Sequence, residues 1–540
     1  MKSKLNNNEN KTTPTYVLTL KSYMQLFQYH TLFKRFTIAE RIYNCLVHEF
    51  KKRYNHMLNS KDYNKIHKKI VNSYKRIDIK KSIIKTDKYK NQSKQIQKEI
   101  KQLQNDIKGF YKIQNELYLK YGLDKNSLSR FLTPIKNHYE DNIDIHTSQK
   151  ILDAMYKSVD KFLYGNGKKI YYKTHGDMLS LESKSNASGI TYRNGFIIWK
   201  GIKFPIIIKN NDIYAQKAIQ DRIKYCRIKR IFVRGKYKFI IQLAMEGIPP
   251  KKFNKETGEV KGSCGIGEVG IDNGTSTTAI CSQYQIKLVE LADMVKDIEN
   301  EKRVILRAMD RSRRSMNSQN FNEDGTIKKG VINDKGKKEK LVWYKSNHYK
   351  KLQGDLRELY RKQADIRKQC HYELIRDILP LGNKFYVETM NYAGLQKRSK
   401  KTTKNKNGKF NKKKRFGKSL ANKAPAMFLT MLGQKLKSSG GTLIKVNTQK
   451  VKASQYNHLT GEYMKKKLYE RWNNFSYNNE DIKVQRDIYS AFLLMNVNDD
   501  LESINLDKCN EKFDDFIKLH DIEIDRLRND NEKKLSSMGI

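Results

Sequence analysis

The hydrophobic pattern of this chain changes its period twice, and these changes limit the folds that its 540 residues can adopt. A short apolar run at 16–20 predicts one strand, and residues 25–160 then follow the spacing of amphipathic helices. Strand patterns replace the helical pattern from Lys168 to Glu246, and strands alternate with helices after Val269. One hydrophobic core rarely serves a chain of this length. We therefore expect a helical domain, a β domain and an α/β domain.

The helical and β regions each contain a clear marker. Within residues 96–110, apolar residues recur at every third or fourth position, which places them on one face of a long helix. The dipeptide Asn194-Gly195 separates two apolar runs and predicts a hairpin with a type I′ turn. A second hairpin is expected at 228–245. The strand near Tyr16 can return to this group and complete a small β-barrel, which the helical region interrupts.

The region after Val269 has the alternation expected of an α/β domain of ribonuclease-H type. Its clearest helix is predicted from Tyr344 to Leu379, where Pro380 stops it. The strands of this region are expected at 268–271, 278–282, 286–291, 384–387 and 442–446.

Three stretches of this region place a carboxylate beside an apolar segment. Asp272 and Glu388 follow runs that predict buried strands, and Asp487 precedes an apolar helical segment at 488–495. Mg²⁺ prefers such hard oxygen ligands, and two ions about 3.5–4 Å apart can hold the attacking and leaving oxygens of a phosphodiester. Each acid taken alone has an ordinary interpretation as a turn or helix cap. Together they predict one metal site at which the three acids meet.

The chain is strongly basic, with 109 Lys and Arg against 57 Asp and Glu and a net charge of +52. This excess, with 10% aromatic residues, is typical of proteins that neutralise phosphates and stack unpaired bases. An AT-rich genome, which favours lysine, accounts for part of the excess. The densest basic run, 396–418, follows Glu388 and contains no acid. It is either a solvated loop or, as we favour, a flap that grips phosphates.

Membrane and disulfide-stabilised proteins are not indicated. No apolar run approaches the roughly 20 residues of a membrane-spanning helix, and residues 1–13 lack the apolar core of a signal peptide. The six cysteines include no CxxC pair, so neither a disulfide framework nor a cysteine zinc site is predicted. We expect a soluble intracellular protein.

Around the three acids the sequence resembles the TnpB nucleases encoded by insertion sequences, which are close to the miniature type V CRISPR effectors. The resemblance is to the three-part RuvC nuclease signature, and the segment from Lys418 to Val446 is similar to the family's linker between the second and third parts. It covers about 230 residues. The matching stretches are Val269-Gly-Ile-Asp-Asn-Gly, Val387-Glu-Thr-Met-Asn391 and Arg486-Asp-Ile-Tyr-Ser-Ala491.

The resemblance implies an RNA-guided DNA endonuclease in which Asp272, Glu388 and Asp487 hold two Mg²⁺ ions. One ion generates hydroxide and the other stabilises the leaving 3′ oxygen, giving 5′-phosphate products. Guide RNA and target double-stranded DNA are the implied partners, and the location is the bacterial cytoplasm, at the nucleoid when DNA is bound. A transposon or CRISPR context and the oligomeric state stay open. The residues expected to contact nucleic acid are Lys397, Arg398, Lys400, Lys401, Lys412, Lys413, Lys414, Arg415, Arg471 and Arg486.

The same resemblance implies a multidomain architecture: an RNase H-like RuvC nuclease domain, a β-barrel wedge domain and a helical recognition insertion. The expected divisions are the first wedge strand at 1–24, the helical recognition domain at 25–165, the wedge β-barrel at 166–248, a linker at 249–267, the nuclease domain at 268–448, a target-nucleic-acid-binding insertion at 449–482, the third nuclease motif at 483–497 and a weakly helical tail at 498–540.

One departure from the family pattern concerns zinc. Many members carry two CxxC pairs between the second and third motifs, whereas Asn457 and Thr460 occupy the first pair's positions here and the second pair is absent. Neither side chain is a good structural zinc ligand. We expect no zinc, packing around Trp472 and Phe475 in its place, and a packing or surface role for His458.

Two other functions remain open at this stage. The segment Gly270 to Thr278 also resembles the phosphate loop of actin, Hsp70 and sugar-kinase ATPases, although no second Asp-x-Gly-rich phosphate motif is found. A nucleic-acid-binding protein that does not cut, such as an RNA-guided repressor or a decayed transposon product, is the other alternative. Survival of all three acids favours the nuclease.

Overall fold

The computed structural model describes residues 13–540 except 85–91, 166, 255, 259, 329, 331–340, 400, 401, 406, 407, 412, 414, 415, 468 and 531–534. The chain divides into two compact units, one made of residues up to 231 with 236–250 and the other of 232–235 with 251–540. None of the helices in the described ranges combines the length and the apolar character needed to cross a membrane.

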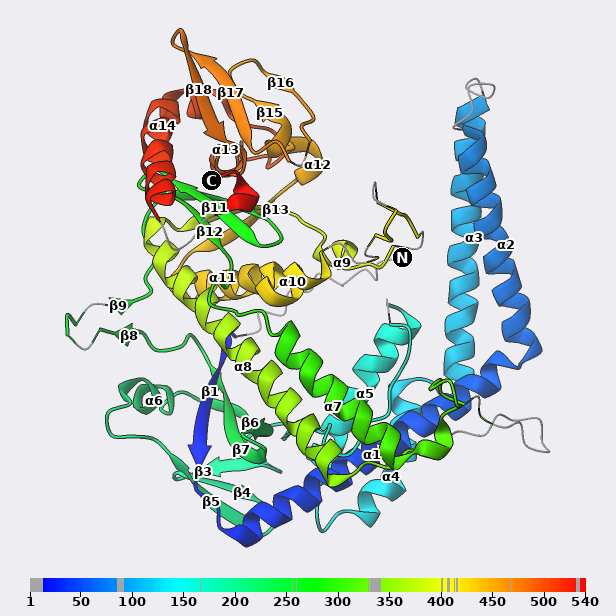
Figure 1. Ribbon diagram of the computed structural model, residues 1–540. Coiled ribbons are helices and arrows are strands. Elements are labelled where there is room, and N and C mark those ends of the chain that lie inside the picture. The colour runs from blue at the N-terminus through cyan, green and yellow to red at the C-terminus, as the bar shows by residue number, and fades with distance from the viewer. Residues whose placement is uncertain are drawn as a thin grey trace. The chain divides into compact units, whose positions relative to one another are not determined.

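The first unit contains a seven-stranded sheet with the order β2-β6-β7-β1-β5-β4-β3 (Figure 1). Its central strand β1 (Thr15–Ser22) pairs antiparallel with β7 (Lys236–Glu246) and β5 (Ile202–Ile207), so the predicted return of the first strand to the later ones is confirmed. The remaining strands are β2 (Ser180–Glu182), β3 (Thr191–Arg193), β4 (Phe196–Trp199) and β6 (Ile223–Val233).

The predicted Asn-Gly hairpin is also confirmed. Strands β3 and β4 pair antiparallel, and Asn194 and Gly195 between them have φ angles of 46° and 83°. Positive φ at both central residues is the requirement of a type I′ turn, which explains the choice of these two residue types.

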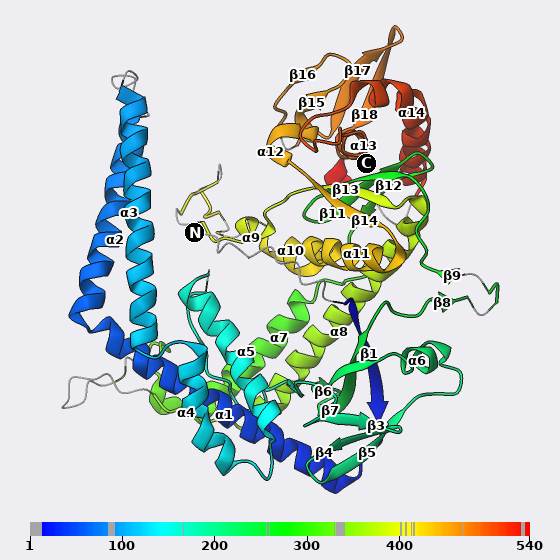
Figure 2. The ribbon, with the colours of Figure 1, turned by 180° about the vertical axis from the view of Figure 1, so that it is seen from behind.

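The helices of the first unit lie between β1 and β2, apart from the short α6 (Ile213–Ala218). Helices α2 (Lys61–Ile84) and α3 (Ser93–Lys120) run side by side as a long pair (Figures 1 and 2). Ile77, Ile100 and Ile107 form the buried seam of that pair, as the predicted apolar face of α3 requires. The other helices are α1 (Leu26–Leu58), α4 (Lys125–His138) and α5 (Ile145–Leu163).

The second unit is built on a five-stranded mixed sheet with the order β12-β11-β10-β13-β14. The central strand β10 (Glu268–Asn273) is antiparallel to β11 (Thr277–Ser282) and parallel to β13 (Lys384–Glu388). Strand β12 (Ile286–Glu290) extends one edge and β14 (Thr442–Val446) the other. All five lie within a residue or two of their predicted ranges.

The two faces of this sheet are covered by different helices. Val269, Ile271 and Phe385 are buried in a core shared with α8 (Asn347–Ile378) and α11 (Pro425–Ser439). The opposite face carries α13 (Arg486–Met495). A Cβ added to Gly270 would lie 1.9 Å from the carbonyl oxygen of Ala491, so α13 packs directly against the backbone of β10. Only glycine fits at that position.

The segment that precedes β14 forms two helices. The first, α10 (Gly417–Lys423), ends at Ala424, which has left-handed backbone angles (φ 45°, ψ 57°), and α11 begins at Pro425. Proline cannot donate a backbone hydrogen bond inside a helix but is favourable at its first position.

The predicted linker at 249–267 holds the short strands β8 (Lys252–Phe253) and β9 (Val260–Lys261). The helices between β12 and β14 also include α7 (Glu299–Met316) and α9 (Tyr392–Leu395).

Two hairpins follow the short helix α12 (Thr448–Val451): β15 (Tyr456–Asn457) with β16 (Glu462–Tyr463), and β17 (Trp472–Tyr477) with β18 (Glu480–Gln485). Phe475 is buried against Tyr489, whereas Trp472 lies at the margin of the same core. His458 is buried and its Nδ1 lies 2.6 Å from the Tyr489 hydroxyl, so it has the packing role.

The tail beyond 498 is more ordered than its sequence indicated. Helix α14 (Leu506–Asn529) buries Phe513 and Phe516 in the core that also holds Phe475 and Tyr489. Aromatic rings from the hairpins, α13 and α14 therefore stabilise this region in the manner of an ordinary hydrophobic core.

Candidate carboxylate site

The parallel pairing of β10 and β13 sets two of the predicted acids beside each other. Ile271 pairs with Val387, so one further step along both strands brings Asp272 next to Glu388. Side chains alternate across a sheet, and Gly270 and Tyr386, two residues earlier, both face α13. Asp272 and Glu388 therefore project from the same face, at the same end of the sheet.

The third acid reaches this place from α13. Asp487 is the second residue of that helix, whose first turn is capped by Gln485 through a 2.8 Å bond from the Ile488 amide to Oε1. Helix α13 crosses β10, β11 and β13. Negative charge is favourable at a helix N-terminus because of the free backbone amides there. The fold thus brings the three predicted acids to one region.

The pKa of Asp272 records this proximity. It is raised well above its ordinary value, first by burial and then by the negative charges of Asp487 and Glu388. The Arg486 guanidinium and a hydrogen bond with Ser490 act in the opposite direction. Asp272 as a residue is partly exposed to solvent, although its carboxyl group is buried. The carboxyl group is therefore recessed but not fully enclosed. Burial likewise raises the pKa of Glu388 to about 7.

Two arginines hold the carboxyl of Asp487. Arg486 Nε and Nη2 both lie 3.2 Å from Oδ1, and Arg471 Nη1 lies 3.4 Å from Oδ2. Arg486 also donates to the carbonyl oxygen of Glu470 at 2.9 Å, and its side chain is only 10% exposed. Both arginines were expected to contact nucleic acid, but in this arrangement their guanidinium groups neutralise Asp487.

The carboxylate oxygens of the site are ligands that suit Mg²⁺, but the three carboxyl groups are not positioned as in a metal site. Within the part of the chain that is described, no group of three or more His, Cys, Asp or Glu side chains is positioned to hold a metal ion. Three mutually repelling carboxylates are the hard oxygen ligands that Mg²⁺ takes, and a divalent cation relieves such repulsion. For Asp487 to ligate a metal, its carboxyl must offer the ion a lone pair that Arg471 and Arg486 do not occupy.

A cavity of about 730 Å³ adjoins Glu388. Its lining includes Thr389 and Tyr392 after β13, and Lys437 and Lys445 from α11 and β14. Burial raises the pKa of Tyr392, and its hydroxyl donates to the Asn273 carbonyl oxygen at 2.8 Å. The lining of the cavity therefore contains two lysines and also Glu388, one of the three acids of the carboxylate site.

Only part of the predicted basic flap can be placed. Lys397 and Arg398 are exposed, and Lys413 is half-buried with its carbonyl oxygen accepting a hydrogen bond from the Ser399 amide at 2.8 Å. The remaining flap residues predicted to contact nucleic acid lie outside the described residues: Lys400, Lys401, Lys412, Lys414 and Arg415.

Some residues of the site were not singled out from the sequence. Ser490 helps to lower the pKa of Asp272, and the Tyr489 hydroxyl contacts the backbone amide and Nδ1 of His458 and so anchors that residue. Tyr392 carried no signal because it lies beyond the second motif. The spacing of Ser490, one helical turn after Asp487, is the one clue that could have identified it.

Comparison with known proteins gives limited likenesses. No family model matches the chain, and no curated protein matches it. A protein solved in a Cas12f1–sgRNA–target DNA complex is similar at 10% identity and a TM-score of 0.40, over 89% of this chain and 98% of that chain. A protein from a CRISPR-Cas12f ternary complex has 12% identity and a TM-score of 0.23, over 90% of this chain and 99% of that chain. The function proposed for this chain rests on its own residues.

Proposed function

We propose that this chain is an RNA-guided DNA endonuclease of the TnpB type, with a RuvC-type nuclease domain in its second unit. The observation that carries the proposal is the meeting of Asp272, Glu388 and Asp487 on one face of the central sheet. They come from three distant segments, and burying like charges together is costly. A function that needs the three negative charges in one place explains that cost.

Asp272, Glu388 and Asp487 are the residues that would hold Mg²⁺. Bound divalent cations activate water and stabilise the charge that develops in the transition state of phosphodiester hydrolysis. Ion pairs with Arg471 and Arg486 hold the Asp487 carboxyl in position. Lys437 and Lys445 line the neighbouring cavity on the α11 side of the sheet, where their charges would attract the phosphates of a bound strand.

Guide RNA and target double-stranded DNA are the proposed partners. A net charge of +52 supplies the electrostatic attraction that both need, but it carries no sequence information. Base pairing between guide and target would supply that information, with the protein reading the shape of the duplex and a short flanking element. We propose that the gene for this chain belongs to an insertion sequence, as the resemblance of the three motifs implies.

The proposal is tested by purifying the chain with its cellular RNA and sequencing that RNA. A matching DNA duplex beside a randomised flank is then incubated with Mg²⁺ or with EDTA. Cutting is expected only with Mg²⁺ and only beside a subset of flanks, and Asp272→Asn should abolish it without loss of RNA. Asp515→Asn is the matched control, because that side chain is 79% exposed on α14.

Each alternative gives a different result. RNA that copurifies with a wild-type chain unable to cut would identify a binding protein that does not cleave. Saturable ATP binding without copurifying RNA would identify an ATPase. Undiminished cutting by Asp272→Asn would refute the carboxylate mechanism while leaving nuclease activity to another site.

A further inference from the structure

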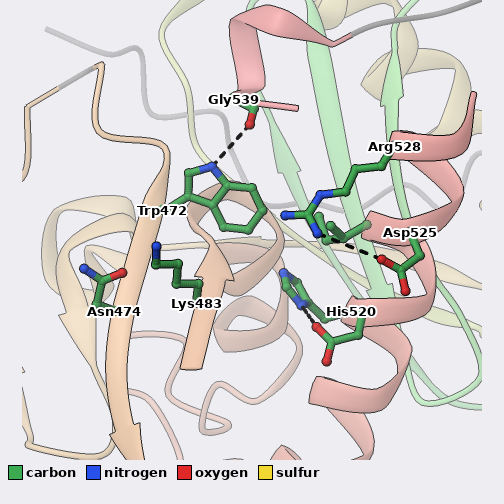
Figure 3. A pocket seen from close by; sticks show the side chains of 9 residues that line it. Trp472, Asn474, Lys483, His520, Asp525, Arg528 and Gly539 are labelled. Atoms are coloured by element: carbon green, nitrogen blue, oxygen red, sulfur yellow. Dashed lines mark hydrogen bonds and ion pairs between the residues drawn. The ribbon is translucent and has the colours of Figure 1, made fainter. Parts of the chain in front are cut away.

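A second cavity, of about 600 Å³, lies between the β17–β18 hairpin and α14 (Figure 3). It has no part in the carboxylate site. The hairpin contributes Trp472, Asn474 and Lys483, and α14 contributes His520 and Arg528. An aromatic ring, an amide and two cations around one hollow are the groups that recognise unpaired bases.

The hairpin presents these side chains by its register. Trp472 and Asn474 are two residues apart on β17 and so project from the same face. Asn474 pairs with Lys483 across the hairpin, which adds the lysine to that face. The intervening Phe475 projects from the other face and is buried in the aromatic core. Burial of Phe475 therefore holds the three polar and aromatic side chains toward the cavity.

The indole of Trp472 is held in place but not covered. Its Nε1 donates to the carbonyl oxygen of Gly539 at 3.3 Å, and its ring meets the His520 imidazole edge-on at an interplanar angle of 89°. His520 is 1% exposed and accepts a hydrogen bond from the Gln485 amide at 3.0 Å. These contacts fix the position of the indole. Trp472 itself remains partly exposed, which leaves area for a ligand to stack on.

The Arg528 side chain forms a second wall of the cavity, facing the Trp472 ring, and this wall can move. Its guanidinium carbon lies 6.0 Å from the centre of the Trp472 ring, and Figure 3 shows the side chain reaching from α14 toward the indole. Two stacking contacts of about 3.5 Å each need about 7 Å between the outer planes. The Arg528 side chain is 61% exposed and its nearest anion, Asp525, lies 4.0 Å away, so a shift of that size meets little resistance.

We propose that this cavity binds one unpaired nucleobase of a nucleic-acid strand. The base stacks on Trp472 beneath the Arg528 guanidinium. At its edge the Asn474 amide donates or accepts hydrogen bonds and the Asp525 carboxylate accepts them. Lys483 lies where it can meet the phosphate of the same nucleotide. Two carboxylates of the lining, Asp521 and Asp525, disfavour the concentrated charge of a free triphosphate.

The position of the cavity connects it with the carboxylate site, and this step rests on the proposed function. Trp472 follows Arg471, an ion-pair partner of Asp487, and it pairs across the hairpin with Gln485, the cap of α13. A strand anchored by one base at Trp472 would therefore present a nearby phosphate to the carboxylates.

The test uses tryptophan fluorescence of the full chain in EDTA, where no metal-dependent cutting occurs. The probes are a short single-stranded oligonucleotide, an abasic oligonucleotide of the same length, and the four nucleoside monophosphates. The base-containing oligonucleotide is expected to quench the fluorescence and the abasic one is not. Trp472→Phe should remove this quenching, whereas Trp343→Phe, the control tryptophan, should keep it.

A second variant keeps Trp472 as the reporter. Arg528→Gln should weaken the apparent Kd of the base-containing oligonucleotide by about three- to tenfold, the loss expected for one cation–π contact. Lys518→Gln, on an exposed part of the same helix outside the cavity, is the control and should leave Kd unchanged.

The outcomes separate the two proposals. Equal quenching by the abasic oligonucleotide, or quenching that survives in Trp472→Phe, would overturn the base site. Quenching by monophosphates alone would also overturn it, because it would assign the cavity to free nucleotides. Failure of DNA cutting would leave the quenching in place, and Asp272→Asn, which removes a proposed metal ligand, should quench as the wild type does.

Discussion

The raised pKa of Glu388 predicts that this side chain destabilises the metal-free protein. The carboxyl has a pKa of about 7 in the folded chain because burial disfavours its charge, and its ordinary value is 4.5. Between these values the folded state keeps a proton that the unfolded state has released. The free energy of unfolding therefore falls as the pH rises from 4.5 to 7, and the loss is complete above pH 7.

The size of the effect follows from the same two values. The difference corresponds to about 3 kcal/mol, since one pKa unit is about 1.36 kcal/mol. Because Glu388 is partly exposed, solvent screens some of this energy, and we take about 2 kcal/mol. Glu388→Gln keeps the shape of the side chain and removes its charge. The metal-free variant should be more stable than the wild type by that amount at pH 8, and the difference should vanish toward pH 4.5.

Thermal unfolding in EDTA, followed by calorimetry, measures the difference. About 2 kcal/mol should raise the Tm of the transition that includes the second unit by about 5 °C at pH 8. Glu480→Gln, an exposed glutamate on β18, is the control and should leave Tm unchanged at either pH. An equal or lower Tm for Glu388→Gln at pH 8, or a gain independent of pH, would refute the reasoning.

Four further predictions follow from the site and its supports. Mg²⁺ should raise the Tm of the wild type at pH 8 by more than that of Glu388→Gln, because the cation offsets the charge that the variant lacks. Arg471→Gln removes a competitor for the third carboxylate and should lower the Mg²⁺ concentration at which DNA cutting is half-maximal. Gly270→Ala places a methyl group 1.9 Å from the Ala491 carbonyl oxygen and should cost more than about 3 kcal/mol in denaturant unfolding, whereas Gly433→Ala on α11, with its nearest neighbour at 3.3 Å, should be nearly neutral. Metal analysis of the purified chain should find no stoichiometric zinc, and a zinc chelator should leave the hairpins folded by circular dichroism.

Local patterns identified much of the second unit from its sequence. Alternating apolar runs predicted all five strands of its sheet, and the acids at the ends of two runs predicted the strand ends that meet at the site. What could not be predicted was the register between strands. That Asp272 and Glu388 project from the same face depends on the pairing of Ile271 with Val387, two residues far apart in the sequence.

The arginine contacts were unpredictable for a related reason. Arg471 reaches Asp487 because Trp472 pairs with Gln485 across the β17–β18 hairpin. The Asn478-Asn479 turn of that hairpin has positive φ at both residues, but a turn signal alone does not predict which side chains beyond it form ion pairs. A basic residue near a motif predicts a phosphate contact, whereas the ion pair of Arg471 with Asp487 depends on tertiary pairing. The packing of α14 was missed because its charged residues obscure the apolar stripe that holds Phe513 and Phe516.

The three carboxylates are separated from one another by roughly a hundred residues of chain. No local folding event can bring any two of them together, and the closure of long loops makes such assemblies slow to form. During synthesis, Asp272 and Glu388 can pair on the sheet well before the segment with Asp487 leaves the ribosome. An unfinished chain therefore holds at most two of the three acids in place. The carboxylate site can therefore form only after α13 has been synthesised.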